Sequence, residues 1–325
     1  MILNIVILIV SLAAVVFGAD WLVEGASGIA RKAGVSEFVI GLTIVGFGTS
    51  CPELVVSITG AFNGNADISV GNVIGSNIFN VNLILGLTAL LSPIAITASN
   101  RRRDIPITLL VSLLFVVLGF GYSLFGLGEA DVLSRIEGVV FLAVFAAYLY
   151  LCFKYDEGAP SSVEGGSEQR ADVRLVKAIG LTLLGLVGLI VGGHYFVDSA
   201  VKIASSLGVS DKFIAITLLA GGTSLPELVT SVVAVIKGRN QLALGNILGS
   251  NVFNILLILG CASVITPLSL ANVSFVDVGV FVASIVLLWI FTLGRKGLTL
   301  GRFKGLLLLL VFIAYYVYLF RNAQA

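Results

Sequence analysis

Two short stretches of this chain combine residue types that a membrane-spanning segment rarely carries. GTSCPE runs from Gly48 to Glu53 and GTSLPE from Gly222 to Glu227, each inside a long apolar run. A proline removes a helix hydrogen bond, and a carboxylate near the middle of a bilayer is costly unless it has a function. The adjacent proline and acid therefore mark both stretches as candidate functional sites.

A second pair of motifs follows the first pair at the same spacing. GNVIGSNIFN occupies residues 71–80 and GNILGSNVFN residues 245–254, so both pairs are offset by 174 residues. A proline kink or GxxxG helix packing would explain any one motif alone. Neither explains why a central acid, a serine and two asparagines recur in both halves. The chain is therefore a duplication that repeats its polar residues.

The repeated residues can form a site lined only by oxygen atoms. Pro52 cannot donate a hydrogen bond to the carbonyl of Gly48, and Pro226 cannot donate one to Gly222. Freed carbonyls beside a carboxylate and hydroxyl groups suit hard cations such as Ca²⁺ or Na⁺. No thiolate or histidine is shared by the repeated pair, which disfavours zinc, copper or iron.

The charge of such a site bears on the kind of transport. Glu53 and Glu227 together carry two negative charges, which one Ca²⁺ or about two to three Na⁺ would nearly neutralise. Both carboxylates left ionised and without a cation would be very unfavourable in the membrane interior. The site should therefore rarely cross the membrane unloaded, which favours an exchanger over a channel.

The elements that must position these residues are membrane-spanning helices. Hydrophobic residues make up 58% of the chain and charged residues 11%, with a mean hydropathy of +1.09. A span needs about 20 apolar residues. The sequence predicts an all-α integral membrane protein with ten transmembrane helices, without a separate soluble domain, at 2–29, 36–62, 69–92, 105–125, 133–153, 174–201, 212–237, 243–266, 275–294 and 302–320.

The duplication predicts how these helices are arranged. Each half holds five predicted helices, and an odd number forces the second half to enter the membrane from the opposite face. We therefore expect two inverted-topology five-helix repeats, with the substrate bound near the midplane between them. The predicted units are a first repeat at 1–153 with its α-repeat at 41–86, a linker at 154–173, and a second repeat at 174–325 with its α-repeat at 215–260.

The positive residues of the loops predict the orientation. Of the 19 Lys and Arg residues, 15 fall on one predicted side and 4 on the other. The positive-inside rule then places the 154–173 linker in the cytoplasm and both termini outside. The linker is rich in Gly, Ser and acids, and its spacing matches no calcium-binding loop. We expect a multi-pass protein of the cell inner (plasma) membrane, with the first apolar segment retained as a helix.

With these residues in view, the chain resembles the calcium/cation antiporter superfamily, most nearly the prokaryotic sodium/calcium exchangers. GTSCPELVVS and GTSLPELVTS, each followed by GNxxGSNxFN, look like that family's α-repeats. The resemblance implies Ca²⁺ and Na⁺ as transported substrates, with no cofactor. The net charge of +1 gives no indication of a nucleic-acid partner, and we expect no enzymatic activity and a monomeric functional unit. The resemblance further implies that the first and sixth helices slide across a rigid core to alternate access.

The resemblance also implies which residues bind the ions. By family analogy, Glu53 and Glu227 bind Ca²⁺ together with the carbonyls of Thr49 and Thr223. Four sites would lie between the second, third, seventh and eighth helices. The sodium sites would add the side chains of Ser50, Ser224, Ser76, Ser250, Asn80 and Asn254 and the carbonyls of Gly46 and Ala220.

One position departs from part of the family. Some relatives carry Asp where this chain has Asn254, and the amide lowers the site charge by one. This departure puts potassium co-transport and the ion stoichiometry in doubt. A Ca²⁺/H⁺ antiporter on the same fold stays open as an alternative. A cation channel is a weaker one, and an intramembrane hydrolase lacks a nucleophile–base pair beside either glutamate.

Further polar residues lie in the first and sixth predicted helices. At the same offset of 174, Asp20 pairs with His194 and Glu24 with Asp198. Anchoring at the membrane interface is the simpler interpretation of these side chains. A place on an ion entry path is the other.

Overall fold

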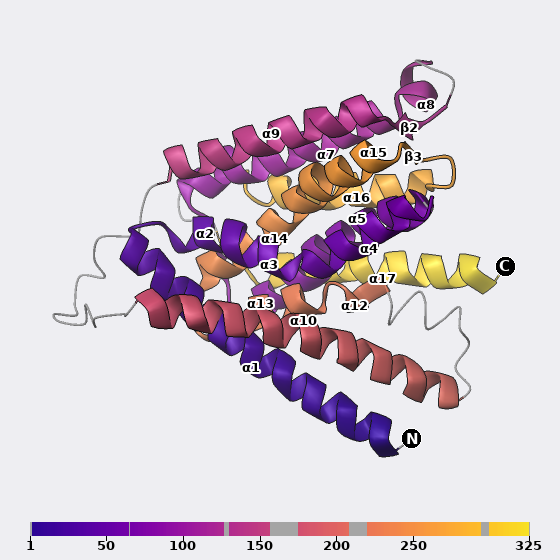
Figure 1. Ribbon diagram of the computed structural model, residues 1–325. Helices are drawn as coiled ribbons and strands as arrows, with labels where there is room; N and C mark the ends of the chain where they lie inside the picture. The colour runs from indigo at the N-terminus through magenta and orange to yellow at the C-terminus, as the bar shows by residue number, and fades with distance from the viewer. Residues whose placement is uncertain are drawn as a thin grey trace.

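A computed structural model describes residues 2–64, 66–126, 130–156, 175–207, 220–293 and 299–324. The polypeptide is almost wholly helical (Figure 1). The first half forms α1 (Ile2–Ala33), α2 (Glu37–Ile40), η1 (Gly41–Val45), α3 (Gly46–Thr49), α4 (Cys51–Phe62), α5 (Ala66–Ile78), η2 (Phe79–Ile84), α6 (Leu85–Leu91), η3 (Asn100–Asp104), α7 (Ile105–Gly119), α8 (Gly121–Phe125) and α9 (Arg135–Lys154).

The second half follows a similar order of elements in its described part. Elements labelled η are π-helical turns, which contain one extra residue per turn and often occur at functional sites. The second half forms α10 (Leu175–Ser206), α12 (Ala220–Gly222), α13 (Leu225–Ile236), α14 (Asn240–Val252), η5 (Phe253–Leu259), α15 (Gly260–Ile265), α16 (Phe275–Ile290) and α17 (Arg302–Gln324).

The lengths of the helices bear on the predicted number of spans. Six described helical stretches are long and apolar enough to cross a membrane, or seven if the bent pair 37–49 and 51–62 counts as one span. The other predicted segments contain α7, α13 and α16, of 15, 12 and 16 residues. At about 1.5 Å per residue, 16 residues reach roughly 24 Å, less than the hydrocarbon thickness of about 30 Å. The protein is an all-α membrane protein, and the count of ten stays a prediction.

Two predicted segments lie partly outside the residues that the structure describes. Most of the predicted linker at 154–173 and the start of the predicted segment at 212–237 lie outside the described residues. Phe120 separates α7 from α8, so the predicted segment 105–125 is two helices. Two short strand pairs, which the sequence did not predict, join the loops of the two halves: β1 (Ile94–Ala95) with β4 (Thr299–Leu300), and β2 (Val132–Leu133) with β3 (Leu268–Ser269).

The most buried helices are those that carry the Asn/Ser motifs. In Ile68–Leu91 and Asn240–Ile265, 78% and 83% of the apolar stretch is buried, whereas the corresponding share is 17% in α17, 22% in α1 and 28% in α10. Figure 1 shows α4, α5 and α14 between the α7–α9 layer and the α1–α10 pair. The two motif-bearing helices therefore form the centre of the molecule.

Helices α1 and α10 pack against each other along their length, one from each half (Figure 1). A Cβ atom on Gly185 would lie 2.5 Å from the Leu22 nitrogen and 2.6 Å from the Gly18 oxygen. Only glycine allows the two backbones to approach this closely. This crossing ties α1 and α10 into a pair at the edge of the core.

Candidate functional site

Both proline-containing helices break at the serine before the motif's proline. Ser50 lies between α3 and α4 with φ −83° and ψ 6°, and Ser224 precedes α13 with φ −85° and ψ 8°. The helix axis of the first half bends by 48° at this point. In each half the proline then sits in the first turn of the new helix, where its missing N–H removes no hydrogen bond.

The serine hydroxyl at each break does not cap its own helix. Serine at an N-cap usually accepts a hydrogen bond from the following backbone, but neither Ser50 nor Ser224 makes that bond. Instead, Ser50 Oγ donates to Glu227 Oε1 at 2.9 Å, and Ser224 Oγ donates to Glu53 Oε1 at 3.1 Å. Each half of the chain therefore supplies a hydroxyl to the carboxylate of the other half.

The sequence predicts that the two prolines leave the carbonyl oxygens of Gly48 and Gly222 without their usual helix partners. At the first break the Ser50 N–H is directed at both Gly46 O and Gly48 O. Leu228 N donates to Ser224 O at 3.0 Å across the second break. Within the described residues no backbone N–H donates to the carbonyl oxygen of Thr223. Gly46 O, by contrast, accepts from Ser50 N at 3.1 Å and from Thr49 Oγ1 at 3.4 Å.

One asparagine in each half, Asn72 or Asn246, hydrogen-bonds to the start of the acid-bearing helix of the same half. Asn246 Nδ2 donates to the Glu227 carbonyl at 3.5 Å and to Ser231 Oγ at 2.9 Å, while its Oδ1 accepts from Thr49 Oγ1 at 3.1 Å. Asn72 repeats every one of these bonds in the other half, with Glu53 O (3.3 Å), Ser57 Oγ (3.1 Å) and Thr223 Oγ1 (3.4 Å). All of these partners are related by the offset of 174 residues, so the duplication seen in the sequence is also present in the contacts.

Four further amides meet where the two central helices cross. Asn80 Nδ2 donates to Asn251 Oδ1 at 3.1 Å, and Asn254 Nδ2 donates to Asn77 Oδ1 at 3.0 Å. Asn77 Nδ2 also donates to the Asn251 carbonyl at 3.4 Å. All four side chains are buried, with at most 1% exposed. These bonds join α5–η2 of the first half to α14–η5 of the second.

The same region contains buried oxygen atoms that the described protein leaves without a hydrogen-bond partner. Buried polar groups almost always have partners, so a cluster of such atoms needs an explanation. Five of them belong to residues predicted to bind ions: Glu53 Oε2, Glu227 Oε2, Ser76 Oγ, Asn80 Oδ1 and Asn254 Oδ1. All five can serve as ligands of a hard cation.

No basic side chain offsets the two acids within the described residues. Glu53 and Glu227 are each 1% exposed, and the four described ion pairs lie elsewhere. Two buried carboxylates without a cation in contact are electrostatically unfavourable. The donor set is all oxygen and its net charge is negative, so it is suited to Ca²⁺ or Na⁺.

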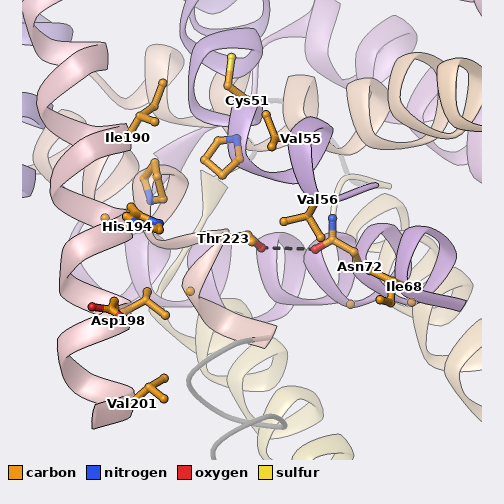
Figure 2. A pocket seen from close by; sticks show the side chains of 17 residues that line it. Cys51, Val55, Val56, Ile68, Asn72, Ile190, His194, Asp198, Val201 and Thr223 are labelled. Atoms are coloured by element: carbon orange, nitrogen blue, oxygen red, sulfur yellow. Dashed lines mark hydrogen bonds between the residues drawn. The ribbon is translucent and has the colours of Figure 1, made fainter. Parts of the chain in front are cut away.

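A cavity of about 910 Å³ lies between α10 and residues next to the two helix breaks, among them Cys51 and Thr223 (Figure 2). Ile190, His194, Asp198 and Val201 follow one another along α10 and form one wall. The hydrogen-bonded pair Asn72 and Thr223 lies at the opposite side, and Cys51 also lines the space. The placement of His194 and Asp198 agrees with the entry-path interpretation of these two residues.

The corresponding space in the other half is filled by α1. Gly193, Val197 and Val201 of α10 line the cavity. Their equivalents at the offset of 174 are Ala19, Val23 and Ser27, which are 0–2% exposed. Likewise, Ile68 in the cavity is 46% exposed and its equivalent Leu242 is 0% exposed. The two halves of the site therefore differ in access, although the crossed serine–glutamate bonds and the bonds of Asn72 and Asn246 match.

Five of the predicted ion ligands contact one another directly, namely Glu53, Glu227, Ser50, Ser224 and Ser250. The hydroxyls of Ser50, Ser224 and Ser250 contact the two carboxylates, with Ser250 Oγ 3.5 Å from Glu227 Oε1. Ala220 begins α12 just before the second break. Sequence analysis did not assign roles to Asn72, Asn246, Asn77 and Asn251. The signal that could have found them was present, because all four lie in the duplicated GNxxGSN motif.

The comparison with known families agrees with this arrangement. The sequence matches the family described as "Sodium/calcium exchanger protein" over residues 3–154 and 177–321. The chain belongs to the sodium/calcium exchanger family. It is therefore a membrane transporter of the cation/Ca²⁺ antiporter type, and the resemblance seen in the α-repeats is confirmed.

Individual members of the sodium/calcium exchanger family are similar over nearly the whole chain. The putative antiporter CaxA of Alkalimonas amylolytica is 40% identical, covering 99% of this chain and 100% of the relative. The sodium/calcium exchanger MaX1 of Methanosarcina acetivorans is 37% identical, covering 98% of both chains. A solved structure of the sodium–calcium exchanger NCX_Mj superposes with a TM-score of 0.82 at 36% identity, covering 96% of this chain and 97% of that one.

Proposed function

We propose that this chain is a secondary active antiporter that exchanges Ca²⁺ for Na⁺ by alternating access. The single observation that carries the proposal is the crossed pair of hydrogen bonds from Ser50 to Glu227 and from Ser224 to Glu53. A cation placed between the carboxylates would be held by both halves at once. Relative movement of the halves would then change both the ligands and the access.

The proposed ligands are those the sequence predicted. Glu53 and Glu227 would bind Ca²⁺ with the carbonyls of Thr49 and Thr223. Na⁺ would use subsets of the same oxygens, so the two kinds of ion compete for the same two negative charges and exchange becomes obligatory. We assign the remaining sodium ligands to the side chains of Ser50, Ser224, Ser76, Ser250, Asn80 and Asn254 and to the carbonyls of Gly46 and Ala220.

The proposed alternating access is supported by the asymmetry around the site. The α10 side is lined by a cavity, whereas the α1 side is packed against α13. If the halves are inverted repeats, the exchange of these two environments opens the site to the opposite face. The glycine crossing between α1 and α10 would let both helices move as one pair during this change.

We further propose that the protein lies in the cell inner (plasma) membrane and crosses it ten times. Both termini would be outside, and residues 154–173 would be in the cytoplasm. The cavity lies toward the C-terminal end of α10, which faces outside in this orientation. The described state would therefore be open outward. The functional unit would be a monomer, because the site uses oxygens from one chain.

The test of the proposed function is ion flux in sealed vesicles. Purified protein is reconstituted with Na⁺ inside, and ⁴⁵Ca²⁺ uptake is measured after dilution into Na⁺-free or Na⁺-matched medium. Uptake that needs the outward Na⁺ gradient is expected. Uptake driven only by a pH gradient would replace the proposal with Ca²⁺/H⁺ antiport, and uptake that persists without any counter-gradient would indicate a channel.

A further inference from the structure

Two of the proposed ion ligands are amides, and an amide has a right and a wrong orientation toward a cation. A carboxylate presents an acceptor oxygen whichever way it turns, but an asparagine presents either its Oδ1 or its NH₂ group. This chain has asparagine at both equivalent positions, Asn80 and Asn254. A cation site built on these residues needs something that fixes the amide orientation.

The hydrogen bonds between the central helices fix both amides. Asn80 Nδ2 donates to Asn251 Oδ1 at 3.1 Å, and Asn254 Nδ2 donates to Asn77 Oδ1 at 3.0 Å. With the NH₂ groups held in this way, Asn80 Oδ1 and Asn254 Oδ1 are left buried and without a partner among the described residues. The orientation that suits a cation is the one the structure contains.

The bonds cross between the two halves of the chain. Asn77 belongs to α5 and orients a residue of η5, while Asn251 belongs to α14 and orients a residue of η2. Asn77 is itself held, because its Nδ2 donates to the Asn251 carbonyl at 3.4 Å. The π-helical turns begin directly after this contact, at Phe79 and Phe253, so the backbone register also changes here.

We infer that Asn77 and Asn251 are positioning residues that turn the amides of Asn254 and Asn80, respectively, so that their oxygens face the transported cation. This inference rests on the proposed function in taking Asn80 and Asn254 as ligands of the transported Na⁺. Neither positioning residue needs to touch the ion. Each accepts a hydrogen bond from the NH₂ group of the ligand asparagine. Without that bond the NH₂ group would be free to turn toward the cation.

The sharpest variant is Asn251→Leu. Asn251 Nδ2 has no partner among the described residues, so the substitution removes one side-chain hydrogen bond, the one from Asn80. Leucine is close to asparagine in volume, and the Asn251 backbone carbonyl stays in place for Asn77. The Asn80 amide then loses its partner and can turn its NH₂ group toward the site, which weakens cation binding.

The measurement is cation binding by purified protein, read as the ion concentration that gives half of the maximal rise in thermal unfolding temperature. Ca²⁺ and Na⁺ are titrated separately. For Asn251→Leu we expect the half-maximal Na⁺ concentration to rise about tenfold, the size expected for a lost hydrogen bond near a charge. Asn77→Leu should give a shift of the same direction.

The same substitutions made in proteins that already carry Asn80→Asp or Asn254→Asp distinguish a positioning role from a merely structural one. In Asn80→Asp the side chain has no NH₂ group to turn, so loss of the acceptor at 251 should change Na⁺ affinity by less than about threefold. Asn254→Asp should relieve Asn77→Leu in the same way. A structural role would give equal losses in both backgrounds.

The matched control is Asn82→Leu. Asn82 is a fully buried asparagine of the same turn, η2, but it donates to Ser284 Oγ at 2.6 Å, away from the motif residues. Its replacement should lower the unfolding temperature and leave the half-maximal Na⁺ concentration unchanged. If Asn77→Leu does not fold, Asn251→Leu still tests the inference on its own.

Several results would overturn the inference. They are an unchanged Na⁺ affinity in Asn251→Leu, a loss that Asn80→Asp does not relieve, and an equal Na⁺ affinity loss in Asn82→Leu. Different results reject the positioning role and the proposed function. Wild-type protein that binds Na⁺ but exchanges Ca²⁺ only for protons would reject Na⁺ exchange and leave the positioning role intact. Wild-type protein that responds to neither cation would reject both.

Discussion

Ser50 and Glu227, 177 residues apart in the sequence, share a hydrogen bond of 2.9 Å at the centre of the protein. Its counterpart joins Ser224 to Glu53 at 3.1 Å. In each bond the hydroxyl of an N-cap serine donates to a carboxylate of the other half instead of capping its own helix. The site is therefore shared between the halves at the level of single atoms.

The crossed bonds predict that Ser50→Ala and Ser224→Ala have closely similar effects. A hydrogen bond to a charged group contributes about 1.5–3 kcal/mol, so each variant should weaken Ca²⁺ binding by roughly tenfold or more. The measurement is the Ca²⁺-dependent rise in unfolding temperature. Ser112→Ala is the control, because Ser112 is also fully buried but donates to Thr108 O in α7. An effect in only one of the two motif serines would contradict the shared site.

The two acids predict a stronger effect. Glu53→Gln or Glu227→Gln removes half of the site charge and almost no volume. Among the described residues neither acid forms an ion pair whose loss would disturb the fold. We expect Ca²⁺ transport to be nearly abolished and the Ca²⁺-dependent stabilisation to disappear, while the protein stays folded and inserted. Vesicle uptake and thermal unfolding measure these outcomes. Normal Ca²⁺ uptake by either purified variant would contradict the proposal that both acids bind one ion.

The α1–α10 crossing predicts opposite outcomes for two glycines of one helix. A Cβ on Gly185 would clash with the backbone of α1, whereas a Cβ on Gly180 meets no atom within 4 Å. Gly185→Ala should therefore force the helices apart and lower the unfolding temperature. Gly180→Ala should be neutral or stabilising by up to about 1 kcal/mol, because alanine favours a helix. Equal unfolding temperatures for the two variants would show that the close crossing is not required.

The sequence was sufficient to predict the central residues because the duplication marks them twice. Glu53, Ser50 and Asn80 each recur at the offset of 174, and chemistry explains why those types suit a cation. The helical character and the break at the proline also follow from local rules, since hydropathy and a missing N–H act within a few residues.

Other features depend on packing that no local pattern contains. Which hydroxyl reaches which carboxylate is decided by the crossing of helices from the two halves, so the bond from Ser50 to Glu227 could not be predicted. The short α7 and α16 differ from the expected spans because hydropathy does not fix where a helix ends. The roles of Asn72 and Asn246 were missed since a motif asparagine can equally be a ligand or a support.

Asn254 predicts that transport needs no K⁺. A neutral amide offers an oxygen to the ion but adds no charge, so Glu53 and Glu227 are the only acids among the described residues of the site. Na⁺-driven ⁴⁵Ca²⁺ uptake should be equal with and without K⁺. Asn254→Asp adds a third buried charge and should change cation selectivity or coupling. A wild type that strictly requires K⁺ would contradict this interpretation of Asn254.

The unequal access of the two halves can be tested with a matched pair of cysteines. Ile68 lines the cavity and is 46% exposed, while its equivalent Leu242 is 0% exposed. In a background without Cys51, Cys152 and Cys261, Ile68→Cys should react with a membrane-impermeant thiol reagent added outside. Leu242→Cys should not react from that side, because α1 and its neighbours cover it in the described state.

Alternating access adds a second expectation for the same pair. If the halves exchange environments during transport, Leu242→Cys should become reactive from the cytoplasmic face under conditions of active exchange, while Ile68→Cys becomes protected. The rates of modification in inside-out and right-side-out vesicles, with and without Na⁺ and Ca²⁺, provide the measurement. Reaction of both cysteines from the same face, unaffected by either ion, would mean that the cavity beside α10 is a fixed feature of the fold and that access does not alternate between the halves.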